Sequence, residues 1–430
     1  MLDPKLVREN PDLVRRDLEK RNAAEKLELL EQVVAKDAEW RRLTEEVNGL
    51  RRGRNDIAKK IAEVKKAKGD AAALLKEAAE IPGKIETLGA RLAELRAEVD
   101  AGLMRLPNIL HDSVPVGKDD AENLEVRKWG EPKVPGFEVK AHAELAEALG
   151  GADFDRARKV AGAGFVYLLS DLALLDQALL RYAVDSLVGK GYSLVEPPIM
   201  MHRAPYEGVV DLSDFESVMY KIENEDLYLI ATSEHPMGAL HMDEIIDEDA
   251  LPIRLAGISP CFRREIGAHG VDTKGLFRMH QFNKVEQFVF CRPEESWAMH
   301  EELLANAEAL FQGLGIPYRV VNVCTGDIGT IAAKKYDIEA WSPRQKKYVE
   351  VVSCSNCTDY QARRLRIRCG KVGGEGKRVP HTLNSTAIAT SRALVVILEN
   401  YQNEDGSVTV PEALRKHMGG KDRILSGGKK

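Results

Sequence analysis

The 430-residue sequence contains only six cysteines, and most of them stand isolated from one another. A disulfide-stabilised secreted scaffold needs a denser and more regular set, so that class of protein is excluded. No apolar run approaches the roughly 20 residues that cross a bilayer. Residues 1–22 alternate charged and apolar side chains and lack the apolar centre of a secretory signal. These absences predict a cytoplasmic protein with no membrane segment.

Two common phosphate-binding motifs are missing as well. The sequence has neither a GxxxxGK[ST] loop nor a GxGxxG turn after a predicted strand. Such glycine-rich loops hold phosphates through backbone N–H groups. If this chain binds ATP, arginine side chains and a metal ion must therefore hold it instead.

Length and net charge direct attention to how residues are distributed along the chain. At 430 residues the sequence exceeds the roughly 250–300 residues of a single hydrophobic core, so we expect two domains. The net charge is −6, so any polyanion must be bound by a local basic surface.

The first hundred residues carry the spacing of a coiled coil. Asp3 and Asn10 each precede a proline and predict two short capped helices. Two runs of apolar residues follow, mostly at spacings of three and four: Trp40, Leu43, Val47, Leu50, Ile57, Ile61 and Val64, then Leu74, Ala78, Ile81, Ile85, Leu88, Leu92, Leu95 and Val99. The break at residues 68–70 predicts an antiparallel hairpin. Pro82 interrupts the second run and predicts a kink or a helix restart.

Basic residues gather on the first of these two helices. Residues 41–68 contain ten Lys or Arg and four acidic residues, a net charge of +6. Such a surface attracts a phosphate backbone, with an affinity that falls steeply as salt rises. A solvated coiled-coil face or a dimerisation rod explains the same charges equally well.

Strand patterns appear after the hairpin. Residues 107–135 are polar and proline-rich, which predicts a linker to a second domain. Residues 192–195, 227–230 and 278–290 read as strands, and another strand leads to Cys261. Side chains two apart share a face, so Arg278, Phe282 and Glu286 are expected to line one wall. A cation, a ring and an acid suit a ligand with phosphate, base and amine groups; a surface strand with cross-strand ion pairs is the alternative.

Ordered segments of the second domain resemble motifs 1, 2 and 3 of the class II aminoacyl-tRNA synthetases: residues 191–198, residues 262–267 with 277–282, and residues 383–402. Further segments resemble the seryl-tRNA synthetase family within that class: 106–108, 114–117, 232–234, 280–286, 353–357 with 361–364, and 383–386. The resemblance covers nearly the whole chain. A single motif would be weak, but this ordered set is specific.

The resemblance implies an α+β fold. An N-terminal antiparallel α-helical coiled-coil hairpin is followed by a class II catalytic domain built on a mainly antiparallel β-sheet flanked by helices. The implied division is a tRNA-binding helical arm at 1–106, a linker at 107–135, the catalytic domain at 136–415 and a flexible basic tail at 416–430.

The implied activity is that of a serine–tRNA ligase. Such an enzyme activates L-serine with ATP to seryl-adenylate and pyrophosphate, then transfers serine to the 3′ end of tRNA(Ser), with tRNA(Sec) a further candidate acceptor. ATP is a substrate, Mg²⁺ accompanies it, and the long variable arm of the tRNA is the feature that the helical arm binds. The family forms homodimers through the motif 1 region, and its arm is expected to serve the partner subunit.

The resemblance also assigns residues. Serine binding falls to Thr232, Ser233, Glu234, Arg263, Glu286, Asn384 and Thr386. ATP binding falls to Arg263, Arg264, Glu265, Arg278, Met279, Phe282, Glu350, Val351, Val352, Ser353 and Arg392, with Phe282 stacking on the adenine and with Glu350 and Ser353 holding Mg²⁺. tRNA binding falls to Arg41, Arg42, Arg51, Arg52, Arg54, Lys59 and Lys60.

Two of these assignments carry a structural condition. Glu350 and Ser353 differ in strand parity, so both reach one site only if the backbone bends between them. Ser385 and Thr386 stand where many family members have Gly-Ser, which retains a hydroxyl at position 386. A pocket that hydrogen-bonds the serine hydroxyl is expected to reject alanine by about 10⁴-fold or more.

Other interpretations remain. Cys354 and Cys357 have the spacing of half a zinc site, but no second pair accompanies them. A ligase that loads a carrier protein would share the catalytic motifs and would not need the basic hairpin. A coiled-coil scaffold would explain the hairpin alone. Adenylation and transfer need positioning and charge neutralisation, so we predict no covalent Ser or Cys nucleophile.

Overall fold

The computed structural model describes residues 1–265, 275–371, 373–374 and 376–426. The chain divides into two compact units, Met1–Ile109 and Leu110–Lys430. Within the described ranges, no helix combines the length and the apolar character needed to span a membrane.

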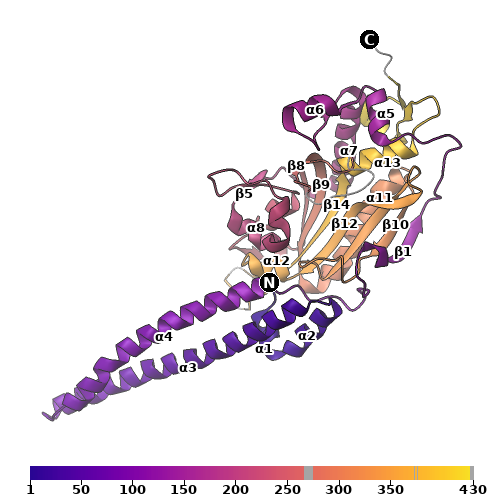
Figure 1. The fold of residues 1–430 in the computed structure, drawn as a ribbon. Helices are drawn as coiled ribbons and strands as arrows, with labels where there is room; N and C mark the ends of the chain where they lie inside the picture. Colours follow the sequence, from indigo (N-terminus) through magenta and orange to yellow (C-terminus); the bar gives the residue numbers. More distant parts are fainter. Residues whose placement is uncertain (266–274, 372, 375, 427–430) are drawn as a thin grey trace. The chain divides into compact units, whose positions relative to one another are not determined.

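The first unit is entirely helical (Figure 1). It consists of α1 (Pro4–Glu9), α2 (Pro11–Lys20), α3 (Ala24–Lys66) and α4 (Ala72–Arg105). The side chains of Asp3 and Asn10 accept from the backbone N–H groups of Lys5 and Leu13, so both predicted caps are confirmed.

Helices α3 and α4 pack along their length as the predicted hairpin. The buried positions of the seam include Leu43 and Val47 on α3 and Leu95 and Val99 on α4. A helix restart at Pro82 is wrong, because α4 runs through that residue without interruption. The neighbouring Ile81 is buried against the hairpin seam, and Pro82 itself faces solvent, so packing holds the turn that lacks one N–H donor.

The second unit is built on an eight-stranded sheet with the order β1-β10-β11-β12-β14-β9-β8-β4. The strands are β1 (Leu124–Trp129), β10 (Tyr318–Asn322), β11 (Lys334–Ser342), β12 (Lys347–Thr358), β14 (His381–Ala389), β9 (Gln281–Cys291), β8 (Ile253–Phe262) and β4 (Ser193–Val195). Every pairing is antiparallel except the edge pair of β4 with β8. The predicted α+β fold with a mainly antiparallel sheet is confirmed.

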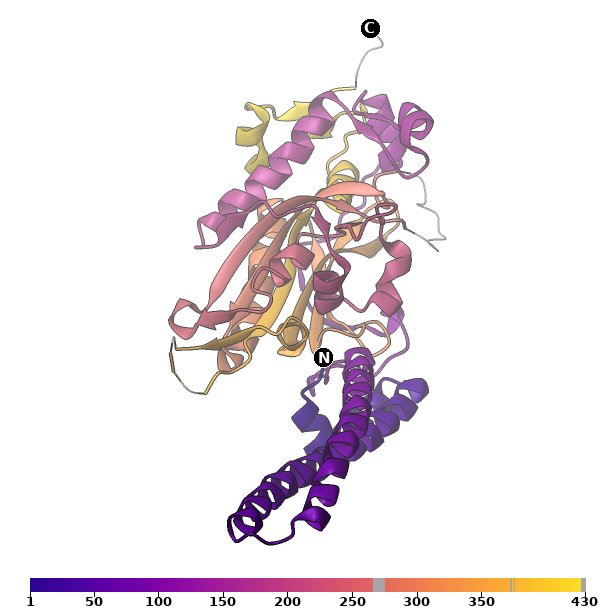
Figure 2. The same cartoon turned by 90° about the vertical axis from the view of Figure 1, so that its left-hand side faces the viewer.

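Alternate side chains of the central strands point to opposite faces of the sheet, one covered by the main core and the other facing the site. On β9, Val285 and Val289 pack with the helices α7 (Ser170–Val188), α11 (Ser296–Gly313) and α13 (Thr390–Asn400). Figure 2 shows α7 as the long pink helix beside the sheet. Phe288, of the other parity, packs with Met237 of α10 (Glu234–Gly238). Glu286 shares the parity of Phe288, so it lies on the sheet face away from the main core.

Two segments are more ordered than the sequence indicates. Residues 107–135, predicted as a linker, supply β1, which extends the sheet by pairing with β10. Residues 423–424, within the predicted flexible tail, form β16 (Arg423–Ile424) and pair with β15 (Val408–Thr409). Backbone pairing of this kind is poorly signalled by composition, because it depends on a partner strand elsewhere in the chain.

Candidate active site

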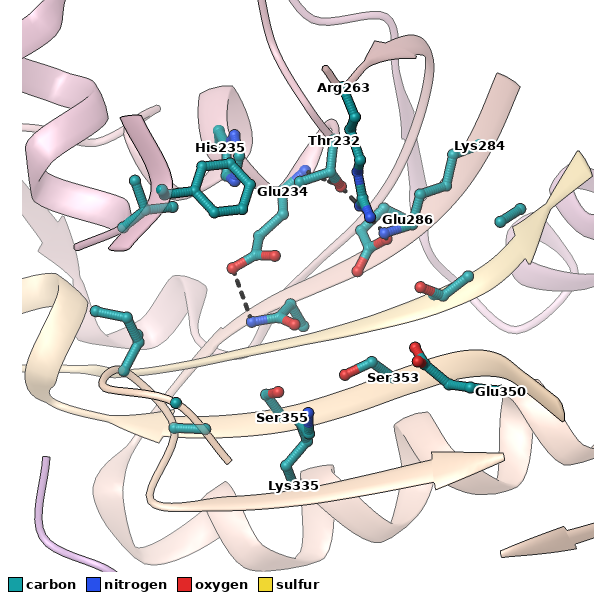
Figure 3. Close-up of a pocket in the computed structure, with 18 of the residues that line it drawn as sticks. Thr232, Glu234, His235, Arg263, Lys284, Glu286, Lys335, Glu350, Ser353 and Ser355 are labelled. Carbon is teal, nitrogen blue, oxygen red and sulfur yellow. Dashed lines mark hydrogen bonds and ion pairs between the residues drawn. The ribbon is translucent and has the colours of Figure 1, made fainter. Parts of the chain in front are cut away.

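A cavity of about 420 Å³ lies on the face of the sheet that carries Glu286 (Figure 3). Its size falls within the roughly 300–1,000 Å³ of small-molecule sites. The sequence-predicted serine residues that line it are Thr232, Glu234, Arg263, Glu286, Asn384 and Thr386. The predicted ATP residues that line it, besides Arg263, are Glu265, Met279, Phe282, Glu350, Val351, Ser353 and Arg392. Segments spread over 160 positions of sequence are thus brought to one cavity.

Four residues of the predicted serine and ATP sites are not among those that line the cavity: Ser233, Arg264, Arg278 and Val352. Ser233 is buried and its hydroxyl donates to the Gly257 carbonyl at 3.1 Å. Val352 packs in the core on the opposite face of β12, and Arg264 is exposed.

The prediction that Arg278 shares the wall of Phe282 and Glu286 is wrong. Strand β9 begins at Gln281, so strand parity does not extend back to Arg278. Its side chain is 45% exposed and forms an ion pair with Glu265 at 3.5 Å. Ile266 and Gly267, the end of the predicted motif 2 segment, lie outside the described residues.

A bulge in β12 brings Glu350 and Ser353 to the same side. Val352 pairs with Ile338 and Glu350 with Glu339, so Val351 is an extra residue between them. The predicted backbone bend is therefore confirmed, and Figure 3 shows both side chains pointing into the cavity.

A second bulge, in β14, extends the lining in the same way. Thr386 pairs with Glu286 and Ile388 with Val285, which leaves Ala387 as the extra residue. Side chains of opposite parity, Thr386 and Ala389, consequently both line the cavity.

Two of the carboxylates that line the cavity, those of Glu234 and Glu286, interact with each other. The amides of Asn384 and Gln361 donate to Glu234 Oε1 at 3.0 and 3.3 Å. Burial, reinforced by the nearby Glu286, raises the pKa of Glu234 to about 7. Burial also raises the pKa of Glu286, and the ammonium of Lys284 opposes that shift. The pair is therefore an acidic subsite with acceptors for a bound cation or hydroxyl.

Arginines stacked on aromatic rings form the cationic part of the cavity. The guanidinium of Arg263 lies 5.4 Å from the centre of the Phe282 ring, and that of Arg392 lies 5.2 Å from the Phe277 ring. Arg392 also forms an ion pair with Glu350 at 3.0 Å. Burial pushes the pKa of Glu350 upward, but Arg392 and Lys335 outweigh it and hold that pKa below its usual value. Glu350 is thus ionised near neutral pH.

Sequence reasoning missed three basic residues of the cavity, Lys284, Lys335 and His235. The parity argument that placed Phe282 and Glu286 on one face applies equally to Lys284, so that residue could have been found. Lys335 pairs with Ser355 across β11 and β12, which sequence alone does not reveal. His235 is buried and its ring nitrogen lies 2.9 Å from the Tyr206 hydroxyl, which is the pattern of a structural histidine.

The donors at Glu350 and Ser353 suit Mg²⁺. An ionised carboxylate and a hydroxyl are hard oxygen ligands, and Mg²⁺ is commonly held by one or two carboxylates together with substrate phosphates. All six cysteines are buried free thiols. In the part of the chain that the structure describes, no three His, Cys, Asp or Glu side chains gather as a metal-binding group.

The predicted tRNA-binding residues all lie on α3 with exposed side chains: Arg41, Arg42, Arg51, Arg52, Arg54, Lys59 and Lys60. Two of them form ion pairs with acidic residues one turn away, Arg41 with Asp37 at 3.0 Å and Arg42 with Glu46 at 3.4 Å. The basic surface predicted from composition is thus available to solvent.

Two protein-family descriptions match the chain. "Seryl-tRNA synthetase N-terminal domain" matches residues 1–110, and "tRNA synthetase class II core domain (G, H, P, S and T)" matches residues 217–401. The serine–tRNA ligase of Methanocella arvoryzae is 62% identical over 98% of this chain and 99% of its own. That of Pyrococcus horikoshii is 52% identical over 99% of this chain and 98% of its own.

Solved structures are similar over the same extent. Seryl-tRNA synthetase from Pyrococcus horikoshii complexed with ATP has a TM-score of 0.97 at 51% identity, covering 100% of both chains. Cytoplasmic serine–tRNA ligase from Naegleria fowleri in complex with AMP has a TM-score of 0.91 at 39% identity, covering 100% of this chain and 99% of that one.

Proposed function

Because the chain belongs to the seryl-tRNA synthetase family and charges tRNA with serine, we propose that the cavity of the second unit activates L-serine with ATP and that the helical unit binds the tRNA. The observation that carries this proposal is the juxtaposition of Glu234, Glu286 and Arg263 in one cavity. An amino acid is a zwitterion, and these side chains offer opposite charges to its two ends.

In the acidic subsite, Glu234 binds the serine ammonium, and Glu286 and Thr386 bind its hydroxyl. Thr232 and Asn384 complete the enclosure. Support comes from the hydrogen bonds that already fix Glu234, since a pre-oriented acceptor loses little freedom when substrate arrives.

ATP occupies the cationic part of the same cavity. Phe282 stacks on the adenine, and Glu265 and Met279 lie beside it. Arg263 bridges the serine carboxylate and the α-phosphate, and Arg392 binds the outer phosphates. The arginine–aromatic pairs support these roles, because stacking orients a planar guanidinium for bidentate contact with phosphate.

Glu350 and Ser353 would hold Mg²⁺, which supplies charge neutralisation for the ATP phosphates when bound. The side chains of the cavity bring a serine carboxylate oxygen in line with the α-phosphorus. The new bond forms as the bond to pyrophosphate breaks, which gives seryl-adenylate. The tRNA 3′-ribose hydroxyl then displaces AMP. No side chain forms a covalent bond to the substrate in either step.

We assign tRNA binding to Met1–Ile109 and catalysis to Leu110–Lys430. The exposed cations of α3 bind the backbone of a long variable arm such as that of tRNA(Ser). Helix α3 spans 43 residues, or about 65 Å at 1.5 Å per residue, which suits an RNA feature remote from the acceptor end.

Exposed apolar side chains support a homodimer through the motif 1 region. Val188, Leu194, Ile199 and Met200, which lie close together in sequence, are each at least 36% exposed. Apolar surface of this kind marks protein interfaces. Six free thiols suit a reducing compartment, and we propose the cytoplasm.

Serine-dependent exchange of pyrophosphate into ATP tests the catalytic assignment without tRNA. We expect the Arg263→Ala variant to lose about 100-fold or more of this activity, since one cation contacts both substrates. Arg254→Ala is the matched control, because Arg254 lies on β8, the strand that leads to Arg263, and pairs with Glu302 outside the cavity. Equal activity of the two variants would contradict the proposal.

A further inference from the structure

A buried lysine stands between the residues of the acidic subsite. Lys284 lies on β9 with its side chain only 8% exposed. Its ammonium forms an ion pair with Glu286 and donates to Thr232 Oγ1 at 3.2 Å. Figure 3 shows the Lys284 side chain reaching toward both partners.

A cation at this position needs a reason, because burying an ammonium is costly unless it is paired. The subsite that Lys284 joins is proposed to bind a substrate ammonium, and an added positive charge opposes such binding. Lys284 must therefore contribute something that outweighs this repulsion.

The geometry suggests what that contribution is. Glu286 is 1% exposed and pairs with Thr386 across β9 and β14, so its carboxylate is almost fully withdrawn from water. Without a cation in contact, a carboxyl in such a place takes up a proton. Glu234 differs, because two neutral amides hold it and no cation of the described part of the chain forms an ion pair with it.

We infer that Lys284 is a positioning residue for serine selection: it keeps Glu286 ionised and oriented as the acceptor for the substrate hydroxyl, and leaves Glu234 for the substrate ammonium. This inference rests on the proposed serine site. Glu286 then binds only the hydroxyl and Glu234 only the ammonium. Discrimination against alanine thus depends on Lys284, although Lys284 need not touch the substrate.

The other titratable groups around this pair come from several elements. Glu234 and His235 face it from α10, Cys261 from β8, and Arg263 from the segment after β8. Arg263 is cationic and helps to keep Glu286 ionised, but it is not the group in contact. Loss of Lys284 therefore shifts the ionisation of Glu286 toward higher pH.

A double-mutant cycle tests the inference by serine-dependent pyrophosphate exchange. The variants are Lys284→Met, Glu286→Gln and the two combined. Lys190→Met is the control, since Lys190 is an exposed lysine that donates to Asn306 at 2.7 Å outside the cavity. The KM for ATP in each variant shows whether the rest of the cavity is intact, and Lys284→Gln replaces Lys284→Met should the latter fail to fold.

We expect Lys284→Met to raise the KM for serine by about 10- to 100-fold, the effect of losing a hydrogen bond to a charged group. The KM for ATP should change by less than about threefold. The ratio of kcat/KM for serine over alanine should fall, and the combined variant should be no worse than Glu286→Gln alone, because both changes remove one acceptor. Raising the pH should restore serine binding in Lys284→Met but not in Glu286→Gln.

Two results would overturn the inference. One is a wild-type KM for serine in Lys284→Met. The other is multiplication of the two single effects in the combined variant, which would mean that Lys284 acts independently of Glu286. An unchanged KM for serine in Glu286→Gln would overturn the proposed serine site itself, so the two failures are distinguishable.

Discussion

The ionisation of Glu234 makes serine binding depend on pH in a calculable way. Burial and the neighbouring Glu286 raise the pKa of Glu234 to about 7 in the substrate-free protein. If the serine ammonium binds only the carboxylate form, binding expels a proton below that pH. The apparent affinity then scales with the ionised fraction, which is about 9% at pH 6 and about 91% at pH 8 for a pKa of about 7.

The KM for serine should therefore fall about tenfold between pH 6 and pH 8, with most of the change below pH 7. The assay is serine-dependent pyrophosphate exchange at saturating ATP. The KM for ATP, measured in parallel, should not follow this curve, because Glu350 and its partner Arg392 are charged over the whole range.

The Glu234→Gln variant separates this carboxylate from the others. It should have a raised KM for serine with little dependence on pH, since Asn384 and Gln361 can still hold the amide but no proton is exchanged. A flat profile in the unaltered protein, or a tenfold slope that persists in Glu234→Gln, would refute the reasoning.

Three further outcomes are expected. The triple change Arg51→Glu, Arg52→Glu and Arg54→Glu on α3 should reduce charging of tRNA, and the slope of log affinity against log salt concentration should flatten by about 0.9 for each lost phosphate contact. Serine-dependent pyrophosphate exchange should stay within about twofold. Parallel losses of both activities would contradict separate roles for the two units. Arg392→Ala should raise the KM for ATP about 10- to 100-fold, because it removes a cation that also fixes Glu350, and an unchanged KM would exclude a phosphate role. Cys354→Ser should keep exchange activity within about threefold, since burial raises the pKa of that thiol and leaves it unreactive; a folded but inactive variant would indicate covalent catalysis.

The sequence predicted the elements whose signals are local. Proline after Asp3 and Asn10 marked two helix starts, and the apolar spacing of residues 40–99 marked the hairpin. These patterns arise within a few turns of one helix, so no distant partner is needed to read them.

The alternation of side chains along strands predicted part of the site correctly and one residue wrongly. It placed Phe282 with Glu286 correctly, and it required a bend between Glu350 and Ser353, which the bulge at Val351 provides. It failed at Arg278, because the strand begins three residues later than the pattern indicates. Strand ends depend on pairing with other strands, and a single sequence does not contain that pairing.

Contacts between distant segments were the least predictable. Asn384 and Gln361 reach Glu234 from positions more than a hundred residues away, and β1 joins the sheet from a stretch with the composition of a linker. The contact of Lys284 with Thr232 was unpredictable for the same reason. Strand parity places Lys284 on the cavity face, but only the fold shows that its ammonium donates to Thr232.

In the proposed function, the second unit activates serine and the helical unit selects the tRNA. The most direct measurement is charging of a tRNA transcript with labelled serine, ATP and Mg²⁺, comparing a transcript that has a long variable arm with one in which the arm is trimmed. We predict that trimming reduces charging by about 100-fold or more and leaves serine-dependent pyrophosphate exchange unchanged. Equal charging of the two transcripts would contradict the assignment of the helical unit.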